Sequence, residues 1–199
     1  MPSSPSPSPS LAPALLLSMP QLLDPNFNRT VILLCKHRPD EGAFGLVVNR
    51  PLITSGPVVV EVRNETTSLE KTTTTSDREL QVWIGGPVEP QRSWILVGHD
   101  EGAAEEQLVR VTRGLYLSTS PDLLNRLLGS SPPDRTRLIV GYAGWGPGQL
   151  EAELEASAWL ISDIDCDLIF ETPAERMWEQ GIRRLGADPS SLHPSCGVH

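Results

Sequence analysis

The stretch RLIVGYAGWGPGQLEAELEASAWL, residues Arg137–Leu160, holds the most distinctive pattern in the chain. It begins with a short apolar run, Arg137–Tyr142, that is typical of a β-strand. The next segment, Gly141–Gly148, is rich in glycine and marks a turn. The text QLEAELEASAWL then predicts a helix whose buried stripe is Leu150, Leu154 and Ala158. The sequence therefore predicts a strand, a glycine-rich turn and a helix in direct succession.

Backbone N–H groups in a turn of this kind can bind an anion, because a helix N-terminus carries partial positive charge. However, no Lys-Ser or Lys-Thr pair follows the glycines, and their spacing is not GxGxxG, so neither nucleotide-binding motif is present. The predicted helix also carries Glu151, Glu153 and Glu155, which disfavour a nearby anion. We therefore favour a purely structural turn over a phosphate site.

Further β-like segments are rich in Val, Ile and Leu and are separated by Gly and Pro: 30–37, 43–49, 80–84, 93–98, 108–111 and 115–118. A helix is predicted with Ser120 as N-cap and Pro121 as first residue, ending at Gly129. Another opens at Thr172–Pro173 and ends at Gly186, with an apolar face of Ala174, Met177, Trp178, Ile182 and Leu185. Strands outnumber helices and do not alternate with them. The predicted fold class is therefore α+β, with a mixed sheet and a few flanking helices.

The composition fits one globular domain, because 39% of the 199 residues are hydrophobic and 21% are charged. Residues 1–10 alternate Pro and Ser and are interpreted as a disordered tail, which leaves 11–199 as the domain. Residues 63–79 are threonine-rich and are interpreted as a surface loop.

The apolar run after the tail is broken by Pro13 and is too short to span a bilayer. Three cysteines without CxxC indicate no disulfide framework, so the expected location is the cytoplasm.

The acidic charge limits the classes of partner. The net charge is −9 at pH 7, and residues 149–171 hold seven acidic side chains and no basic one. Affinity for duplex DNA depends largely on Lys and Arg that displace counterions from phosphates. No helix-turn-helix spacing is present either. We therefore expect no direct duplex DNA binding and no membrane binding; the expected partner is a protein or a metabolite.

Six residues make up the predicted ligand site, which lies where three loops follow β-like segments: Asn49, Arg50, Gly85, Gly86, Tyr142 and Trp145. The glycines let a ligand approach backbone donors, and the two rings supply walls with polar edges. Arg50 beside Asn49 suits a carboxylate or phosphate. The alternatives are that the glycines serve turns only and that Arg50 makes a surface salt bridge. No nucleophile, base or metal ligand set can be named, so no catalytic residue, metal or cofactor is predicted.

Several distinctive motifs follow one another along the chain. They are SMP at 18–20, DPxF at 24–27, CKH at 35–37, GAFG at 42–45 leading into VVNRP at 47–51, IGGPV at 84–88, GYAGWGPGQLEAEL at 141–154, and LIFETP at 168–173 with Trp178 beyond it. As an ordered set they resemble the YqgE/AlgH family, from about Leu11 to the C-terminus. The chain departs from that family after Pro51, where members usually have a helical segment and this chain reads SGPVVVEV.

The resemblance implies a single α+β domain whose mixed sheet is curled and partly barrel-like, with LIFETP spanning the last strand and the start of the last helix. Members are commonly labelled transcriptional regulators, although no activity or catalytic residue is agreed for them. We therefore expect a non-enzymatic binding or regulatory module that acts without direct DNA binding. The alternative is a small-molecule-binding enzyme of unknown reaction.

Overall fold

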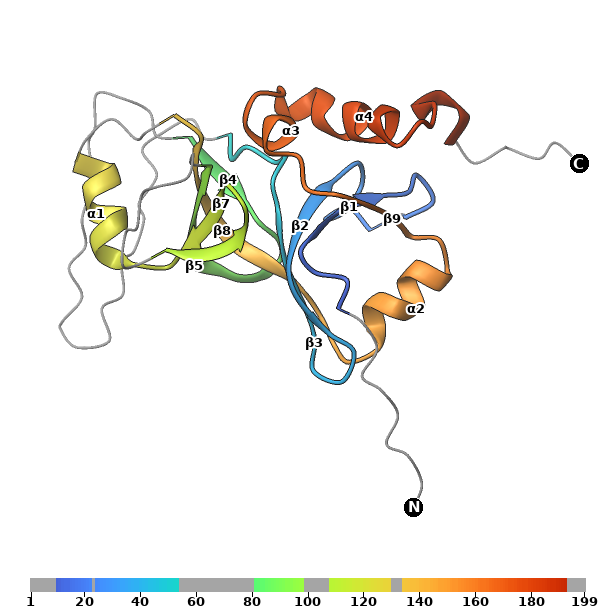
Figure 1. The fold of residues 1–199 in the computed structure, drawn as a ribbon, viewed down its shortest axis with the longest axis horizontal. Helices are drawn as coiled ribbons and strands as arrows, with labels where there is room; N and C mark the ends of the chain where they lie inside the picture. The colour runs from blue at the N-terminus through green and yellow to red at the C-terminus, as the bar shows by residue number, and fades with distance from the viewer. Residues whose placement is uncertain (1–9, 23, 54–80, 99–107, 130–133, 193–199) are drawn as a thin grey trace, which may run out of the picture.

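The computed structural model describes residues 10–22, 24–53, 81–98, 108–129 and 134–192 (Figure 1). In this part of the chain the strands are β1 Ala14–Ser18, β2 Val31–Arg38, β3 Gly42–Val47, β4 Val82–Ile84, β5 Val88–Gly98, β6 Val109–Thr112, β7 Leu115–Ser118, β8 Thr136–Trp145 and β9 Trp159–Ser162. The helices are α1 Pro121–Gly129, α2 Gln149–Glu155, α3 Cys166–Phe170 and α4 Ala174–Arg184, followed by the 3-10 helix η1 Pro189–Leu192.

All nine strands belong to one sheet with the order β6-β7-β5-β8-β3-β2-β1-β9, and β4 pairs with β8 outside this path. The β4–β8 pair is parallel and the other pairs are antiparallel. The sheet is therefore mixed, and it curls into a half-barrel within a single domain, as predicted. The predicted α+β class is confirmed.

Strand β8 holds the two halves of the sheet together because it changes partners along its length. Residues 136–140 pair with β4 and β5, whereas residues 143–145 pair with β3. Between them Gly141 has a φ of 71°, and a Cβ there would lie 2.4 Å from the carbonyl oxygen of Gly86. Only glycine adopts this backbone conformation without strain and permits this approach. Gly141 therefore lets β8 pass close to the Gly86 turn at the point where β8 changes partners.

The core has three parts, each covered by a different helix. Met177, Trp178 and Ile182 of α4 pack with a cluster on one face of β1 and β2. Leu150 of α2 packs on the opposite face of these strands. Leu123, Leu124 and Leu127 of α1 pack against β4, the start of β8 and part of β5. In Figure 1, α3 and α4 (red) lie above β1 and β2, α2 (orange) lies on the other side, and α1 (yellow) lies at the far end near β5 and β8.

Local signals in the sequence placed most elements correctly. Helix α1 begins at Pro121, and the hydroxyl of Ser120 accepts the N–H of Leu123 at 3.3 Å, as expected of an N-cap. Helix α4 also lies where it was predicted. The seven predicted strand segments correspond to β2 through β8, with shifts of a few residues at their ends.

Four details of the sequence analysis are wrong. The helix after the glycine turn ends at Glu155, because Ser157 has a φ of 57°, and the next residues form β9 instead. The segment 168–170 is part of helix α3 and not a strand. Strand β1 was not predicted at all. Finally, Leu185 follows α4 and is 40% exposed, whereas it was expected to be buried.

The tail interpreted from residues 1–10 lies outside the described residues, except for Ser10, and so does the threonine-rich segment 63–79. Strand β1 starts shortly after Ser10, and its whole length is buried between β2 and β9. None of the helices in the described ranges is long and apolar enough to cross a membrane.

Candidate functional site

An open groove of about 420 Å³ lies where β3, β5 and β8 meet. It is lined by Ala43, Phe44, Val88, Arg92, Trp94, Tyr142, Gly144 and Trp145, which we call the aromatic groove. Strand pairing brings these residues together, since Phe44 lies opposite Gly144 and Ala43 lies opposite Trp145. The site is therefore built from segments about 50 residues apart in sequence.

Three aromatic rings of the groove pack against one another. The ring centroid of Phe44 lies 4.7 Å from that of Trp94 and 5.2 Å from that of Tyr142. Trp94 and Tyr142 meet edge to face at 6.1 Å. Rings at these distances hold one another in place. The groove therefore has an apolar wall of three packed rings.

The groove has one charged lining residue, Arg92, which is brought there by an irregularity in β5. The register shifts between Val88 and Ser93, and Glu89 adopts a φ of 44°. The guanidinium of Arg92 lies 4.7 Å above the Trp94 ring, and its Nη1 lies 3.2 Å from Glu89 Oε2. The side chain of Arg92 is 50% exposed. The groove therefore combines aromatic faces with a solvent-accessible cation at its rim.

Beyond the groove, the polar groups of the glycine-rich turn are already hydrogen-bonded to one another and to α2. One oxygen of Glu153 accepts from the indole Nε1 of Trp145 at 2.8 Å and from that of Trp159 at 2.7 Å. Its other oxygen accepts from Gln149 at 2.8 Å. Gln149 in turn accepts the N–H of Gly146 at 3.0 Å.

The remaining donors of the turn are also used, since the N–H of Gly148 is donated to Pro39 at 3.1 Å and that of Gln149 to Gly146 at 3.1 Å. With these N–H groups already bonded, the turn is a structural connection and offers no cradle for an anion. This arrangement agrees with the structural interpretation of the glycines. It also holds the Trp145 indole in the cluster under α2, on the face of the sheet opposite to the rings of Phe44 and Tyr142.

The six predicted site residues separate into two groups. Tyr142 and Trp145 line the aromatic groove. Gly86 lies directly behind it, because a Cβ at this position would be 2.3 Å from the Tyr142 carbonyl group, and Gly85 is paired with Val47 and Val140 through its backbone.

Asn49 and Arg50 do not line the groove. The Asn49 side chain accepts from Val31 N and donates to Arg29 O, both at 2.9 Å. Arg50 donates to the carbonyl oxygens of Pro25 and Asn28, and burial lowers its pKa. Both side chains therefore bind the loop between β1 and β2.

The sequence analysis missed Phe44, Arg92 and Trp94. Phe44 and Trp94 were placed within predicted strands, but nothing local indicates that their faces meet those of Tyr142. The signal that could have found them is an aromatic residue in each of three β-segments, which is the usual composition of a ligand wall. Arg92 precedes the predicted strand 93–98 and gave no signal.

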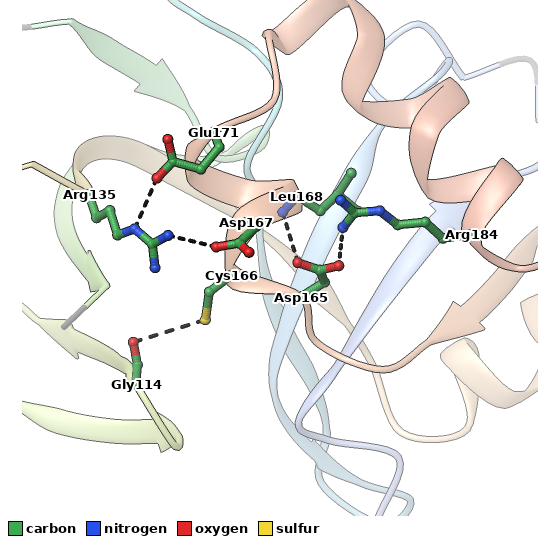
Figure 2. Close-up of polar contacts among 8 residues, drawn as sticks. All are labelled: Gly114, Arg135, Asp165, Cys166, Asp167, Leu168, Glu171 and Arg184. Atoms are coloured by element: carbon green, nitrogen blue, oxygen red, sulfur yellow. Dashed lines mark hydrogen bonds and ion pairs between the residues drawn. The ribbon is translucent and has the colours of Figure 1, made fainter. Parts of the chain in front are cut away.

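A second polar cluster joins α3 to its neighbours (Figure 2). Arg135 lies between Asp167, at 2.6 Å, and Glu171, at 2.9 Å, and these contacts raise its pKa. Asp165 caps α3 by accepting the N–H of Leu168 at 2.9 Å, and it also pairs with Arg184. Burial alone would raise the pKa of Asp165, but these hydrogen bonds lower it below its usual value. The cluster fixes α3 between β8 and α4.

Cys166 lies in this cluster, where burial raises its pKa and its Sγ approaches the carbonyl of Gly114 at 4.0 Å. Such a thiol is less reactive than an exposed one. Within the described ranges, no three His, Cys, Asp or Glu side chains are arranged to hold a metal ion. The histidine and cysteine spacing of the last seven residues lies outside those ranges.

Arg137 is a buried cation that serves the fold. It is 5% exposed, donates to the carbonyl oxygens of Val48 and Ile169, and lies 3.7 Å above the ring of Trp83. Burial lowers its pKa to about 10. Because it connects the end of β3 with α3, we interpret Arg137 as a structural tie between the sheet and the helices.

Residues 15–190 match the family model DUF179, described as AlgH-like. Curated relatives include UPF0301 proteins of Anaeromyxobacter dehalogenans strain 2CP-C, 40% identical with 92% of this chain and 91% of the relative covered, and of Myxococcus xanthus, 40% identical with 96% and 99% covered.

Two solved structures are similar across nearly the whole chain. One is the solution structure of the AlgH protein from Pseudomonas aeruginosa, with a TM-score of 0.66, 31% identity and full coverage of both chains. The other is the crystal structure of protein DIP2367 from Corynebacterium diphtheriae, with a TM-score of 0.66, 20% identity and 94% and 92% coverage, which supports the fold alone. Since the family model spans most of the chain and the relatives agree with it, this chain belongs to the AlgH-like family.

Proposed function

We propose that the protein is a non-enzymatic binding module and that the aromatic groove is its ligand site. The observation that carries the proposal is the open groove of about 420 Å³, in which the rings of Phe44, Trp94 and Tyr142 form a wall beside a half-exposed Arg92. A volume of this size is typical of small-molecule sites. The ligand class that suits it is a flat or cyclic apolar group that stacks on the rings, with a polar or anionic group toward Arg92.

The proposal keeps all six residues of the site predicted from the sequence but gives them different roles. Tyr142 and Trp145 contact the ligand, and Gly85 and Gly86 shape the groove from behind. Asn49 and Arg50 act at a distance by holding the loop that follows β1. The polar groups of the groove do not include a nucleophile next to a base, which is why binding is preferred to catalysis.

A regulatory role without direct DNA contact belongs to the same proposal. The acidic residues of 163–171 are partly paired with Arg135 and Arg184, so these arginines are not available to bind phosphates. We infer a cytoplasmic location, which the free thiols Cys35 and Cys166 support. Sequence-selective binding of duplex DNA tighter than about 10⁻⁷ M at physiological salt would contradict the DNA part of the proposal.

The groove is tested by titrating the ¹⁵N-labelled chain with a library of aromatic and cyclic metabolites. We expect ligands to shift the indole signal of Trp94, which lies in the wall of the groove, and to leave that of Trp178, in the α4 core, unchanged. Tyr142→Leu should abolish the shifts, whereas Tyr116→Leu on β7 provides a matched control away from the groove. Binding that survives Tyr142→Leu would exclude the groove. Turnover of any library compound, lost on replacing one polar groove residue, would favour the enzyme alternative.

A further inference from the structure

The irregular part of β5 presents an ion pair at the rim of the aromatic groove. Between Val88 and Ser93 the pairing of β5 with β8 shifts register, and Glu89 adopts a φ of 44°, a left-handed conformation that costs energy in a residue with a side chain. Within this stretch the Glu89 carboxylate lies 3.2 Å from Nη1 of Arg92. Strained residues and bulges of this kind are concentrated at ligand sites. The rim therefore carries a negative and a positive charge side by side.

Both charges of this pair keep the capacity to bind a ligand. The side chain of Arg92 is 50% exposed and that of Glu89 is 45% exposed. A guanidinium has five N–H donors, and within the described part of the chain Arg92 uses one of them, to Glu89. An exposed ion pair contributes little to the stability of a fold. A ligand can therefore bind to both charges without a large loss elsewhere.

The wall of the groove also contains a donor that lacks an acceptor. The guanidinium carbon of Arg92 lies 4.7 Å from the centroid of the Trp94 indole, whose Nε1 is buried without a hydrogen-bond partner among the described residues. A guanidinium only donates, so Arg92 does not satisfy this N–H. Since buried polar groups are nearly always hydrogen-bonded, an acceptor is missing here. A ligand carboxylate that binds Arg92 brings an acceptor close to this indole.

The Glu89 carboxylate limits which anions Arg92 accepts. A ligand carboxylate on the same guanidinium lies close to Glu89, and the two negative charges repel each other where water screens them only in part. A positive group beside the ligand carboxylate removes this repulsion, because it pairs with Glu89. In an α-amino acid the ammonium group stands next to the carboxylate. The adjacent charges of Arg92 and Glu89 therefore match a zwitterion better than a simple anion.

We propose that the aromatic groove binds a zwitterionic α-amino acid with an aromatic side chain. Its carboxylate pairs with Arg92 and accepts the N–H of Trp94, while its ammonium group pairs with Glu89. Its ring packs on Phe44 and Tyr142, which belong to the same apolar wall. The inference rests on the proposed function of the groove as a ligand site and names the class of ligand. The ring supplies affinity, and the two charges supply selectivity.

The test uses four compounds that separate the three parts of this ligand. Phenylalanine has the ring and both charges, 3-phenylpropanoate lacks the ammonium group, 2-phenylethylamine lacks the carboxylate, and free alanine lacks the ring. Each is titrated into the ¹⁵N-labelled full chain at neutral pH. We expect phenylalanine to bind about five- to tenfold more tightly than either singly charged compound, and free alanine to bind about tenfold more weakly than phenylalanine. The indole proton of Trp94 should move downfield with phenylalanine, because it gains a carboxylate acceptor, and that of Trp178 should stay in place.

Two substitutions test the charges one at a time. Glu89→Gln removes both the repulsion and the partner of the ammonium group. Phenylpropanoate should then bind more tightly and phenylalanine more weakly, so that their affinities differ by less than about twofold. Arg92→Gln should weaken both compounds by about tenfold. Arg183→Gln breaks an exposed pair with Glu179 on α4, far from the groove lining, and as the matched control should leave both affinities unchanged.

The outcomes separate this inference from the proposed function. Equal binding of phenylalanine and phenylpropanoate to the wild type would overturn the inference and leave the groove as a site for anions. A phenylalanine complex in which the Trp94 indole proton does not move downfield would overturn it as well. If neither these compounds nor the metabolite library shift any signal of the groove, the proposed function fails and the inference fails with it.

Discussion

Trp145 and Glu153 lie eight residues apart and are joined by a 2.8 Å hydrogen bond from the indole Nε1 to a carboxylate oxygen. Trp159 donates to the same oxygen, so one side chain of α2 satisfies two indoles that pack edge to face with centroids 6.0 Å apart. Helix α2, the end of β8 and the start of β9 therefore depend on one carboxylate. This makes Glu153 the residue that holds both indoles in the cluster under α2.

Replacing Glu153 should destabilise the protein. In Glu153→Leu both indole N–H groups lose their acceptor, and each buried unsatisfied group costs about 1–3 kcal/mol. We expect the free energy of unfolding in urea to fall by about 2–4 kcal/mol. Glu155→Leu, on the exposed side of the same helix, is the control and should change stability by less than about 0.5 kcal/mol. Equal effects of the two substitutions would show that the indole contacts are not stabilising.

Two glycines with the same backbone conformation should respond differently to alanine. Gly141 and Gly148 both have a φ of 71°, but a Cβ meets the Gly86 carbonyl oxygen at 2.4 Å in the first case and nothing within 4 Å in the second. Gly148→Ala should cost about 1–2 kcal/mol from left-handed strain alone. Gly141→Ala should cost clearly more, as measured by urea unfolding. If the two midpoints coincide, the close approach of β8 to the Gly86 turn is not tight.

The Asp165–Arg184 pair should make stability depend on pH. The pKa of Asp165 is lowered in the folded protein, so its contribution is present above the unfolded value, about 3.9, and is lost as the pH falls through the folded pKa. Asp165→Asn keeps the cap of α3 but removes the charge. It should be less stable than the wild type at pH 7, and the difference should shrink below about pH 4.

The exposed neighbour Asp163 provides the control for this comparison, because its carboxylate has no ion-pair partner within the described part of the chain. Asp163→Asn should leave the unfolding midpoint nearly unchanged at both pH values. A difference between wild type and Asp165→Asn that stays constant from pH 7 to pH 3 would refute the electrostatic explanation.

The described cysteines should react slowly with alkylating agents. Burial raises the pKa of Cys35 to about 12 and raises that of Cys166 as well, so little thiolate is present near pH 8. Iodoacetamide followed by peptide mass spectrometry should leave Cys35 unlabelled until denaturant is added. Cys166, which is partly exposed, should be labelled in the native protein but more slowly than a free cysteine peptide. Rapid native labelling of Cys35 would mean that β2 opens readily.

Local sequence signals were sufficient where one short segment determines the structure. Helix α1 is an example, since Ser120, Pro121 and Gly129 mark its ends without help from the rest of the chain. Local signals were insufficient for β9. The helix before it ends at Glu155, and Ser157 then adopts a left-handed conformation that nothing in the sequence indicates for a non-glycine residue. The pairing of β9 with β1, which joins distant parts of the chain, selects a strand there over a longer helix.

The candidate site was partly predictable for a similar reason. Tyr142 and Trp145 adjoin the glycine-rich turn and were identified from it. Phe44 and Trp94 enter the same wall only through the β3–β8 and β5–β8 registers, which local periodicity does not fix. Arg92 reaches the groove because β5 is irregular between Val88 and Ser93, a feature that no local signal in the sequence indicates.

The position of β1 between β2 and β9 affects how the protein folds during synthesis. Strand β1 ends at Ser18 and β2 begins soon afterwards, at Val31. Strand β9, however, is translated about 140 residues after β1, which at about 5–20 residues per second takes roughly 7–30 s. Throughout this interval the wholly apolar residues Leu15–Leu17 have one open edge and no α4 above them. The nascent chain therefore exposes an aggregation-prone apolar strand early in translation. That strand is buried only when β9 and α4, in the last quarter of the sequence, have been synthesised.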